Sequence, residues 1–537
     1  MKKLYALLFA SIIPLMTFAQ SGGLDQKINE WFTPFSNAVQ AVIFYSISIN
    51  DTTSIPIVLI VLLAGATYFT FYFGFPAIRF FGTAINVVRG KYDDIETDDT
   101  AVGDDVSVNV VEGDVVDTIK DESHHGEVSH FQALTAALSA TVGLGNIAGV
   151  AIAIALGGPG ATLWMVLAGF LGMASKFAEC TLGVRYREIG PDGTVYGGPM
   201  YYLSRGFAEK GLGGLGKGFA VFFAVMCIGG SFGGGNMFQA NQAAAQFTSL
   251  LGVQSSWAGT AFGVVMAILV AIVIIGGIKR IGKVAEKIVP FMAGIYVLAA
   301  TIIIVANIGA VPWAFGQIFE GAFTAKGIAG GFVGVLIVGF QRAAFSNEAG
   351  VGSAAIAHSA VKTKYAASEG IVALLEPFID TIVICTMTAL VIIIFNHDGQ
   401  FVFGQLNAAN EVVITATGEG LGGVNLTARA FDSVIPGFSY ILTIAVILFA
   451  FSTMLSWSYY GLQSWKYLFG RSMAVDYTYK ILFCLMVVVG AASSLSAVVG
   501  FSDAMIFAMV FPNIIGVILL APRVKEELEK YLNAIKK

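Results

Sequence analysis

Charged residues are scarce in this chain of 537 residues. Lys, Arg, Asp and Glu make up 12% of it, whereas hydrophobic residues make up 56% and the mean hydropathy is +0.78. Soluble domains carry about 25% charged residues. The composition therefore excludes an ordinary soluble fold and predicts a membrane protein. The net charge of −5, with no basic patch, gives no indication of a nucleic-acid partner.

Cysteine and histidine are also rare, with four and five copies. Cys180, Cys227, Cys385 and Cys484 fall in or beside apolar runs, without the spacing of a metal site, and we expect them to be free, buried thiols. The chain has no HExxH, GxSxG or P-loop motif. Without such a catalytic set, an enzyme is not expected.

Long apolar runs are abundant. Residues 1–20 combine a basic start, a short apolar run containing Pro14 and a small residue at Ala19, which is typical of a cleaved signal peptide; the alternative is a first membrane anchor. Counting further runs of about 20 residues predicts eleven transmembrane helices. They are 54–76, 131–156, 160–182, 217–248, 257–277, 288–308, 328–357, 369–395, 437–460, 477–493 and 497–520.

The distribution of Lys and Arg predicts the orientation. If residues 21–53 form a short extracellular or periplasmic segment, 25 of the 30 basic residues fall on the inner side, and Lys27, Lys326 and Arg429 fall outside. The N-terminus of this multi-pass protein of the cell (inner or plasma) membrane is then outside. Segment 77–130, with an acidic linker at 93–127, and the tail 521–537 are cytoplasmic. The outer loop 396–435 is expected to form a small hairpin or cap.

Two apolar runs are interrupted. Residues 139–149 read SATVGLGNIAG, with glycines and polar residues where a lipid-facing helix would carry leucine. Backbone outside the helical ladder is tolerated at membrane depth only where it lines a protein-buried cavity. Residues 340–358, FQRAAFSNEAGVGSAAIAH, interrupt the sixth span after 54–76, whereas 139–149 interrupt the first. Paired breaks of this kind predict an inverted-repeat transporter with its substrate site at the breaks.

Polar side chains in other spans are candidate ligands. Asn236 and Gln239 share a helix face beside a glycine run, so we expect a ligand contact, with helix–helix hydrogen bonding as the alternative. Thr453 shares a face with Ser452 and Ser456, and Trp457 follows one turn later. Hydroxyl and carbonyl oxygens are hard ligands that suit Na⁺, although hydroxyls also bond to their own helix.

Charged residues inside spans are costly and indicate function. Arg342 and Glu348 mark such a site or pair with each other as a structural staple. Glu376 and Asp380, four residues apart, are a cation or proton site or are partners of Arg342. Asp503 is too isolated to assign.

Four segments resemble the alanine or glycine:cation symporter family, the sodium:alanine symporters. They are GNIAGVAIAIALGGPGA (145–161), GGPMYYL (197–203), SNEAGVGSAAIAH (346–358) and STMLSWSYYG (452–461). The resemblance covers roughly residues 54–525. It implies an all-α leucine-transporter-type fold, with one extra helix before a core at 131–520. That core would hold ten helices in two inverted five-helix repeats, with its first and sixth helices broken. The implied activity is Na⁺-coupled symport of alanine or glycine into the cell by alternating access.

The resemblance also implies roles for single residues. The backbone N–H groups of Leu144 and Gly145 would bind the substrate carboxylate. Gln239, Thr453 and Trp457 would line the substrate, with the indole filling the space of a larger side chain. Sodium would occupy two places: Thr141 and Asn146 would line one, and the carbonyls of Ser139 and Val142 with Thr453 would make the other.

Two alternatives remain open. A transporter of the same fold would be coupled to H⁺ if Glu376 or Asp380 carries a proton. A membrane substrate sensor that moves no cargo is the second alternative, but the sequence shows no attached signalling domain. In each case the expected partners are a small neutral amino acid and the lipid bilayer, with no obligatory protein partner.

Overall fold

The computed structural model describes residues 23–50, 53–96, 110–111, 114–115, 128–190, 194–253, 255–324, 331–408 and 410–536. The predicted signal peptide at 1–20 and most of the acidic linker at 93–127 lie outside the described residues.

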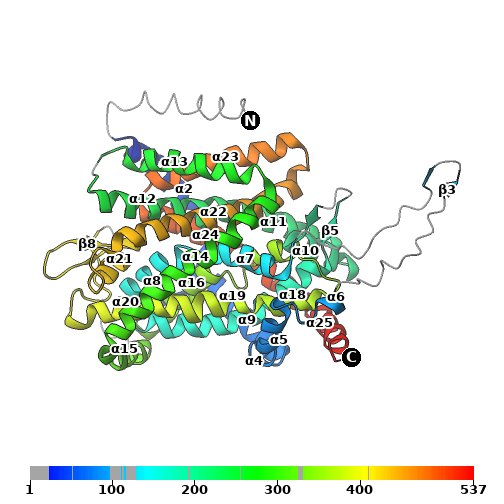
Figure 1. The fold of residues 1–537 in the computed structure, drawn as a ribbon, viewed down its shortest axis with the longest axis horizontal. Helices are drawn as coiled ribbons and strands as arrows, with labels where there is room; N and C mark the ends of the chain where they lie inside the picture. Colours follow the sequence, from blue (N-terminus) through cyan, green and yellow to red (C-terminus); the bar gives the residue numbers. More distant parts are fainter. Residues whose placement is uncertain are drawn as a thin grey trace.

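The described chain is mostly helical. Its long helices run side by side across Figure 1, with the β8 hairpin and α21 at one end and α10, β5 and α18 at the other. Within the described residues, seven helices or continuous helical segments are long and apolar enough to cross a membrane, or eight if one bent pair counts as a single span. The seven are Ala161–Arg185, Gly213–Leu251, Arg280–Ala306, Ala366–Asp398, Phe438–Phe469, Met473–Ala492 and Leu495–Ala534.

The bent pair contains the first predicted break. Helix α7 (His130–Thr141) starts at a capping box, in which Ser129 and Gln132 satisfy each other's backbone N–H groups. It ends before a one-turn π-helix, η2 (Gly145–Gly149), which leads into α8 (Val150–Gly157). The two halves meet at 49°. The glycine-rich segment thus leaves the helical ladder as the sequence predicts.

The second predicted break separates α16 (Gly331–Asn347) from α17 (Ala354–His358). Between them, Glu348, Gly350 and Gly352 have φ angles of 57°, 84° and 92°. Glycine adopts such angles freely, whereas a side chain such as that of Glu348 is strained there. The chain therefore turns sharply where the sequence places a charged residue among glycines.

The other helices and π-helices surround these breaks. The N-terminal helices are α2 (Leu24–Ile43), α3 (Ile57–Tyr72), α4 (Pro76–Arg79), α5 (Phe81–Val88) and α6 (Asp93–Glu96). Next come α9 (Ala161–Arg185), α10 (Pro199–Glu209), α11 (Gly213–Phe232), η3 (Gly233–Met237), α12 (Phe238–Leu251), α13 (Ala258–Ile274), α14 (Gly277–Ala306), η4 (Ile308–Ala310) and α15 (Val311–Thr324). The last are α18 (Ala366–Ala373), α19 (Leu375–Pro377), η5 (Phe378–Cys385), α20 (Thr386–Phe395), η6 (Asn396–Asp398), α21 (Val424–Asp432), α22 (Phe438–Phe469), α23 (Met473–Ala492), α24 (Leu495–Ala508) and α25 (Val510–Ala534).

Four short antiparallel hairpins complete the described fold: β1 (Ser46–Asn50) with β2 (Thr53–Pro56), β3 (Val110–Val111) with β4 (Asp114–Val115), β5 (Glu188–Ile189) with β6 (Val195–Tyr196), and β7 (Val412–Val413) with β8 (Gly420–Leu421). The hairpin expected within 396–435 is therefore confirmed. Segment 21–53 contains an unpredicted helix, α2, whose Asp25 carboxylate accepts the N–H groups of Gly259 and Thr260 at the start of α13. This contact ties the N-terminal segment to the bundle.

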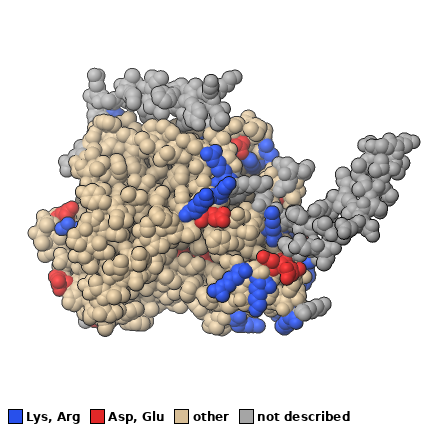
Figure 2. Space-filling model, viewed as in Figure 1, with Lys and Arg blue, Asp and Glu red and all other residues tan. Residues whose placement is uncertain are grey.

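Basic residues are unevenly spread over the surface. In Figure 2, most Lys and Arg side chains on the visible face lie toward the α10 and α18 end of Figure 1, and most of the remaining face carries no charge. An uncharged middle suits contact with lipid tails.

Candidate functional site

The first break contacts the end of α16, just before the second break. A Cβ placed on Gly145 would lie 3.2 Å from the Cα of Ser346, at the end of α16. A Cβ on Gly143 would meet the Thr453 hydroxyl and lie 3.3 Å from Oε1 of Gln239. Glycine at position 143 therefore lets α12 and α22 approach the first break, and at position 145 it allows a close contact with α16.

The side chain of Gln239 reaches across to the first break. The backbone N–H of Leu144 donates to Oε1 of Gln239 at 3.1 Å, and Nε2 of Gln239 donates to the Gly234 carbonyl at 2.9 Å. All these groups are buried. The amide oxygen of Gln239 thus occupies the position that an oxygen of a ligand carboxylate would take at the Leu144 N–H.

Helix α22 joins α7 just before the break. The Thr453 hydroxyl donates to the Ser139 carbonyl at 3.0 Å, and the Ser139 hydroxyl donates to the Ser452 carbonyl at 2.9 Å. The Thr141 hydroxyl instead bonds back to Ala137 in its own helix at 3.2 Å. Val142 lies where α7 ends. Of the oxygens expected to form one Na⁺ site, the structure brings together those of Ser139 and Thr453.

Asn146 contacts a buried carboxylate. Its Nδ2 donates to Oδ1 of Asp380 at 2.5 Å, and its Oδ1 accepts the Gly143 N–H at 2.8 Å. The hydroxyls of Ser346 and Thr381 donate to the other Asp380 oxygen at 2.9 and 2.7 Å. Asp380 is fully buried, and no Lys, Arg or His of the described chain forms an ion pair with it. A carboxylate in this condition binds a cation or a proton, because an uncompensated buried charge is costly.

Trp457 lies between the second break and η3. Its Nε1–H donates to Oε1 of Glu348 at 2.8 Å. A Cβ on Gly235 would overlap the indole ring. Asn236, by contrast, turns away and donates to the Phe483 carbonyl on α23 at 2.7 Å. The structure therefore brings Gln239 and Thr453 to the first break and Trp457 to the second. It does not bring Asn236 to either break.

Arg342 forms an ion pair with Asp503 on α24. The Nε2 of Gln341 donates a hydrogen bond to the same Asp503 carboxylate at 2.9 Å. The suggested pairings of Arg342 with Glu348, Glu376 or Asp380 are therefore wrong. Arg342 also lies 5.2 Å over the Phe345 ring. Asp503 and Gln341 line a cavity of about 540 Å³ whose wall includes α2. Sequence reasoning missed this pair because its members lie 161 positions apart.

Six buried residues form a continuous ionic chain at the α18 end of the molecule. In order of contact they are Glu96, His130, Glu369, His358, Glu376 and Lys176. Each histidine faces a carboxylate at both ring nitrogens, so both nitrogens act as donors and each ring is an imidazolium. Formal charges then alternate along the chain and cancel.

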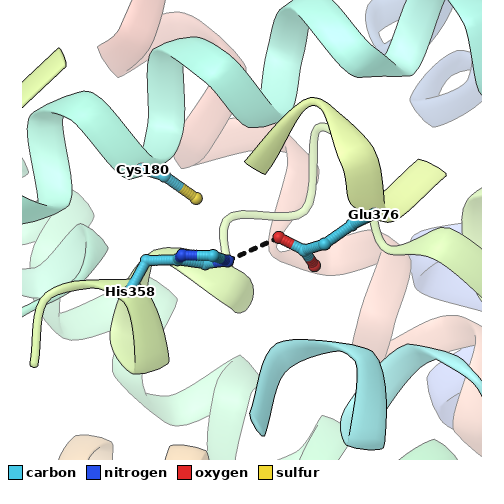
Figure 3. Close-up of side chains that lie close together, drawn as sticks. All are labelled: Cys180, His358 and Glu376. Atoms are coloured by element: carbon cyan, nitrogen blue, oxygen red, sulfur yellow. Dashed lines mark hydrogen bonds and ion pairs between the residues drawn. The ribbon is translucent and has the colours of Figure 1, made fainter. Parts of the chain in front are cut away.

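Cys180 lies beside this ionic chain. Figure 3 shows the edge of the His358 ring pointing at Glu376, with the Cys180 thiol above the ring. One ligand atom from each of the three residues falls within 4.8 Å of the others, as in a metal site. However, both nitrogens of His358 are engaged by carboxylates, and the Lys176 ammonium lies 3.1 Å from Glu376. A metal cation would have to displace these partners, so the arrangement fits an ion-pair network better.

Comparisons with known proteins identify the family of this chain. The model of the sodium:alanine symporter family matches residues 39–537. The chain is 44% identical over 420 residues to the sodium/alanine symporter AgcS of Methanococcus maripaludis, covering 78% of this chain and 87% of that one. It is 31% identical to the probable sodium/glutamine symporter GlnT of Bacillus subtilis, covering 90% of this chain and 89% of GlnT.

The fold is shared with a solved structure, that of MhsT in complex with L-phenylalanine. The TM-score is 0.51 at 16% identity, with 74% of this chain and 89% of that chain covered. The expected leucine-transporter-type fold is thereby confirmed. The matched family and the identity to its members show that this chain belongs to the sodium:alanine symporter family.

Proposed function

We propose that the protein takes up alanine or glycine into the cell by Na⁺-coupled symport and alternating access. The observation that carries the proposal is the Asp380 carboxylate. It is buried beside the two broken helices, it accepts three neutral donors, and it forms no ion pair within the described chain. A co-transported cation would supply the missing positive charge.

The substrate carboxylate would bind at the first break. The N–H groups of Leu144 and Gly145 lie at the start of η2, and N–H groups at such a helix start attract an anion. Gln239 Oε1 now accepts the Leu144 N–H, so a substrate carboxylate would replace one oxygen acceptor by another. Thr453 and Trp457 would form the wall beside the substrate.

Two cation positions follow from the oxygens at the breaks. Asp380 with Asn146 and Ser346 would hold one ion, and the Thr141 hydroxyl would join them by leaving its bond to Ala137. The carbonyls of Ser139 and Val142 with the Thr453 hydroxyl would hold the second. Carbonyls freed from a helical ladder and hydroxyl oxygens are the ligands that discontinuous transporter helices offer to Na⁺. Because each ion and the substrate contact the same break, binding of one would raise affinity for the other, and the coupling is reciprocal.

The proposed topology has eleven spans. The seven long helical segments and the bent pair would be completed by α3, α13 and the broken pair α16–α17. The end rich in Lys and Arg would face the cytoplasm, which places the N-terminus outside and the C-terminus inside. The two inverted repeats would then begin at α7 and α16.

Transport by the full chain in proteoliposomes tests the proposal. We expect uptake of labelled alanine under an inward Na⁺ gradient and none when K⁺ replaces Na⁺ at the same pH. Glycine and glutamine would be compared as competitors, since one relative is described as a probable sodium/glutamine symporter. Full uptake in Na⁺-free buffer under a proton gradient would show that the ion bound at Asp380 is H⁺ and not Na⁺. Alanine binding without uptake under either gradient would indicate a sensor.

A further inference from the structure

Glu348 is an unusual residue at the second break. It is 2% exposed, it has a positive φ of 57°, and it has no Lys, Arg or His within ion-pair distance in the described chain. The Ser353 hydroxyl donates to its Oε2, and the indole Nε1–H of Trp457 donates to its Oε1 at 2.8 Å. Both oxygens of this carboxylate therefore accept hydrogen bonds from neutral donors, one just before α17 and one on α22.

Trp457 is fixed from several sides. Its ring rests on Gly235 in η3, where a Cβ would overlap it, and Cζ3 would lie 3.4 Å from a Cβ on Gly230. Tyr460 packs edge-on against the same ring at 5.3 Å between centroids. Within the described chain, Glu348 is the residue that accepts a hydrogen bond from the indole N–H. Removing this acceptor would leave a buried N–H without a partner, which costs free energy and favours another orientation of the ring.

We propose that Glu348 is a positioning residue that fixes the indole of Trp457 and thereby sets the largest side chain the amino-acid site admits. The inference rests on the proposed function, because it takes Trp457 as a wall of the substrate site. A wall rejects a longer aliphatic chain only if it cannot rotate away, since an apolar pocket discriminates weakly through contact alone.

Glu348 and Trp457 lie on two different elements of the fold. Glu348 belongs to the turn between α16 and α17, and Trp457 belongs to the unbroken helix α22. A rearrangement of that turn would move the carboxylate and release the indole. The size limit would therefore apply in the closed arrangement and relax when the break opens.

Three variants of the full chain separate this role from a general structural one. Glu348→Leu keeps the volume and removes the acceptor. Glu348→Gln keeps an acceptor oxygen for the indole. Ser353→Ala removes the other donor to Glu348 and leaves the indole bond in place, which makes it the matched control.

Fluorine NMR of 5-fluorotryptophan-labelled protein gives a readout that does not depend on substrate. The chain has six tryptophans, and loss of a signal in Trp457→Phe assigns the one of interest. We expect that signal to shift and broaden in Glu348→Leu and to stay sharp in Glu348→Gln and Ser353→Ala. An unchanged Trp457 signal in folded Glu348→Leu would overturn the inference, whatever the protein transports.

Competition uptake gives the second readout. Relative to alanine, leucine should compete about tenfold better in Glu348→Leu than in the parent, whereas Ser353→Ala should keep the parent's ratio. If Trp457 becomes mobile but the ratio does not change, Glu348 does not set the size limit and the inference is wrong. If the parent itself takes up no alanine with Na⁺, the proposed function fails instead, and the selectivity part of the inference fails with it.

Discussion

His358 at the end of α17 and Glu376 on α19 form a buried ion pair, with 2.6 Å between Nε2 and Oε1 and no solvent exposure of either side chain. The other nitrogen of His358 contacts Glu369 on α18, which also contacts His130 at the start of α7. One carboxylate thus contacts α7, which leads into the first break, and α17, which follows the second break. The ionic chain fixes α7 and α17 to α18 at one end of the molecule.

Glu369→Gln should destabilise the protein by about 3–5 kcal/mol, because it leaves two buried imidazolium rings short of a counter-charge. Thermal unfolding of the purified chain in detergent would measure the change. Glu188→Gln is the matched control, since Glu188 pairs with Arg205 and Arg471 at an exposed position. There we expect a loss of at most about 1 kcal/mol. Equal losses in the two variants would mean that the ionic chain adds no special stability.

Asp380→Asn should raise the Na⁺ concentration for half-maximal alanine uptake by about 100-fold, because the variant removes the only formal charge proposed at that ion position. The measurement is uptake against Na⁺ at fixed alanine. Asp398→Asn, at a side chain that is 83% exposed, serves as the control and should leave the Na⁺ dependence unchanged. A parental Na⁺ curve in folded Asp380→Asn would remove Asp380 from the ion site.

Thr453→Val should weaken the second ion position. The change keeps the shape of the side chain but deletes the hydroxyl that donates to the Ser139 carbonyl at 3.0 Å. A net hydrogen bond of about 1 kcal/mol corresponds to a rise of about fivefold in the Na⁺ requirement. Thr453→Ser retains the hydroxyl and should stay near the parent. The same effect in both variants would point to packing of the methyl group, not to the oxygen.

Trp457→Ala should broaden the substrate range and lower the affinity for alanine, because the cavity left behind admits a longer chain while the lost packing is not replaced. Competition uptake with glycine, alanine, valine and leucine would show the change. Trp465→Ala is the control on the same helix, since the Trp465 indole donates to the Val475 carbonyl away from the breaks. A folded Trp457→Ala variant with the parent's rank order and affinity would show that Trp457 faces neighbouring helices only.

The topology can be tested by labelling. The four native cysteines are buried, so they can be replaced to leave a background with no reactive thiol. A cysteine at Ser123, in the acidic linker, should resist an impermeant maleimide in intact cells and react after permeabilisation. A cysteine at Thr417, exposed in the segment between β7 and β8, should react in intact cells. Labelling at Ser123 in intact cells would reverse the proposed orientation.

The sequence predicted the broken helices well because a glycine-rich, polar segment inside an apolar run reports directly on the local backbone. It predicted the direction of Asn236 less well. Asn236 lies in the π-helix η3, where the number of residues per turn differs from that of an α-helix. The rule that places residues three apart on one face therefore does not hold between Asn236 and Gln239, and the two side chains reach different neighbours.

The ionic chain was not predicted. Its members come from α6, α7, α9, α17, α18 and α19, and His130 and Glu369 lie 239 positions apart. No short motif can indicate such contacts, because folding alone brings the partners together. The available signal was the presence of Lys176, His358 and Glu369 within or beside apolar spans, where charged side chains need partners.

The hydrogen bond from the Leu144 N–H to Gln239 bears on how quickly a bound amino acid can leave the carrier. If the substrate carboxylate binds that N–H, it gains the bond only by ending an internal one of similar quality, and release restores the internal bond at once. The Leu144 N–H would then never be left without an acceptor, so departure of the amino acid would cost little at that group. A receptor benefits from holding its ligand for long periods, whereas a carrier benefits from this exchange because each cycle ends in unloading. Gln239 would thus shorten the residence time of the substrate as well as shape its site.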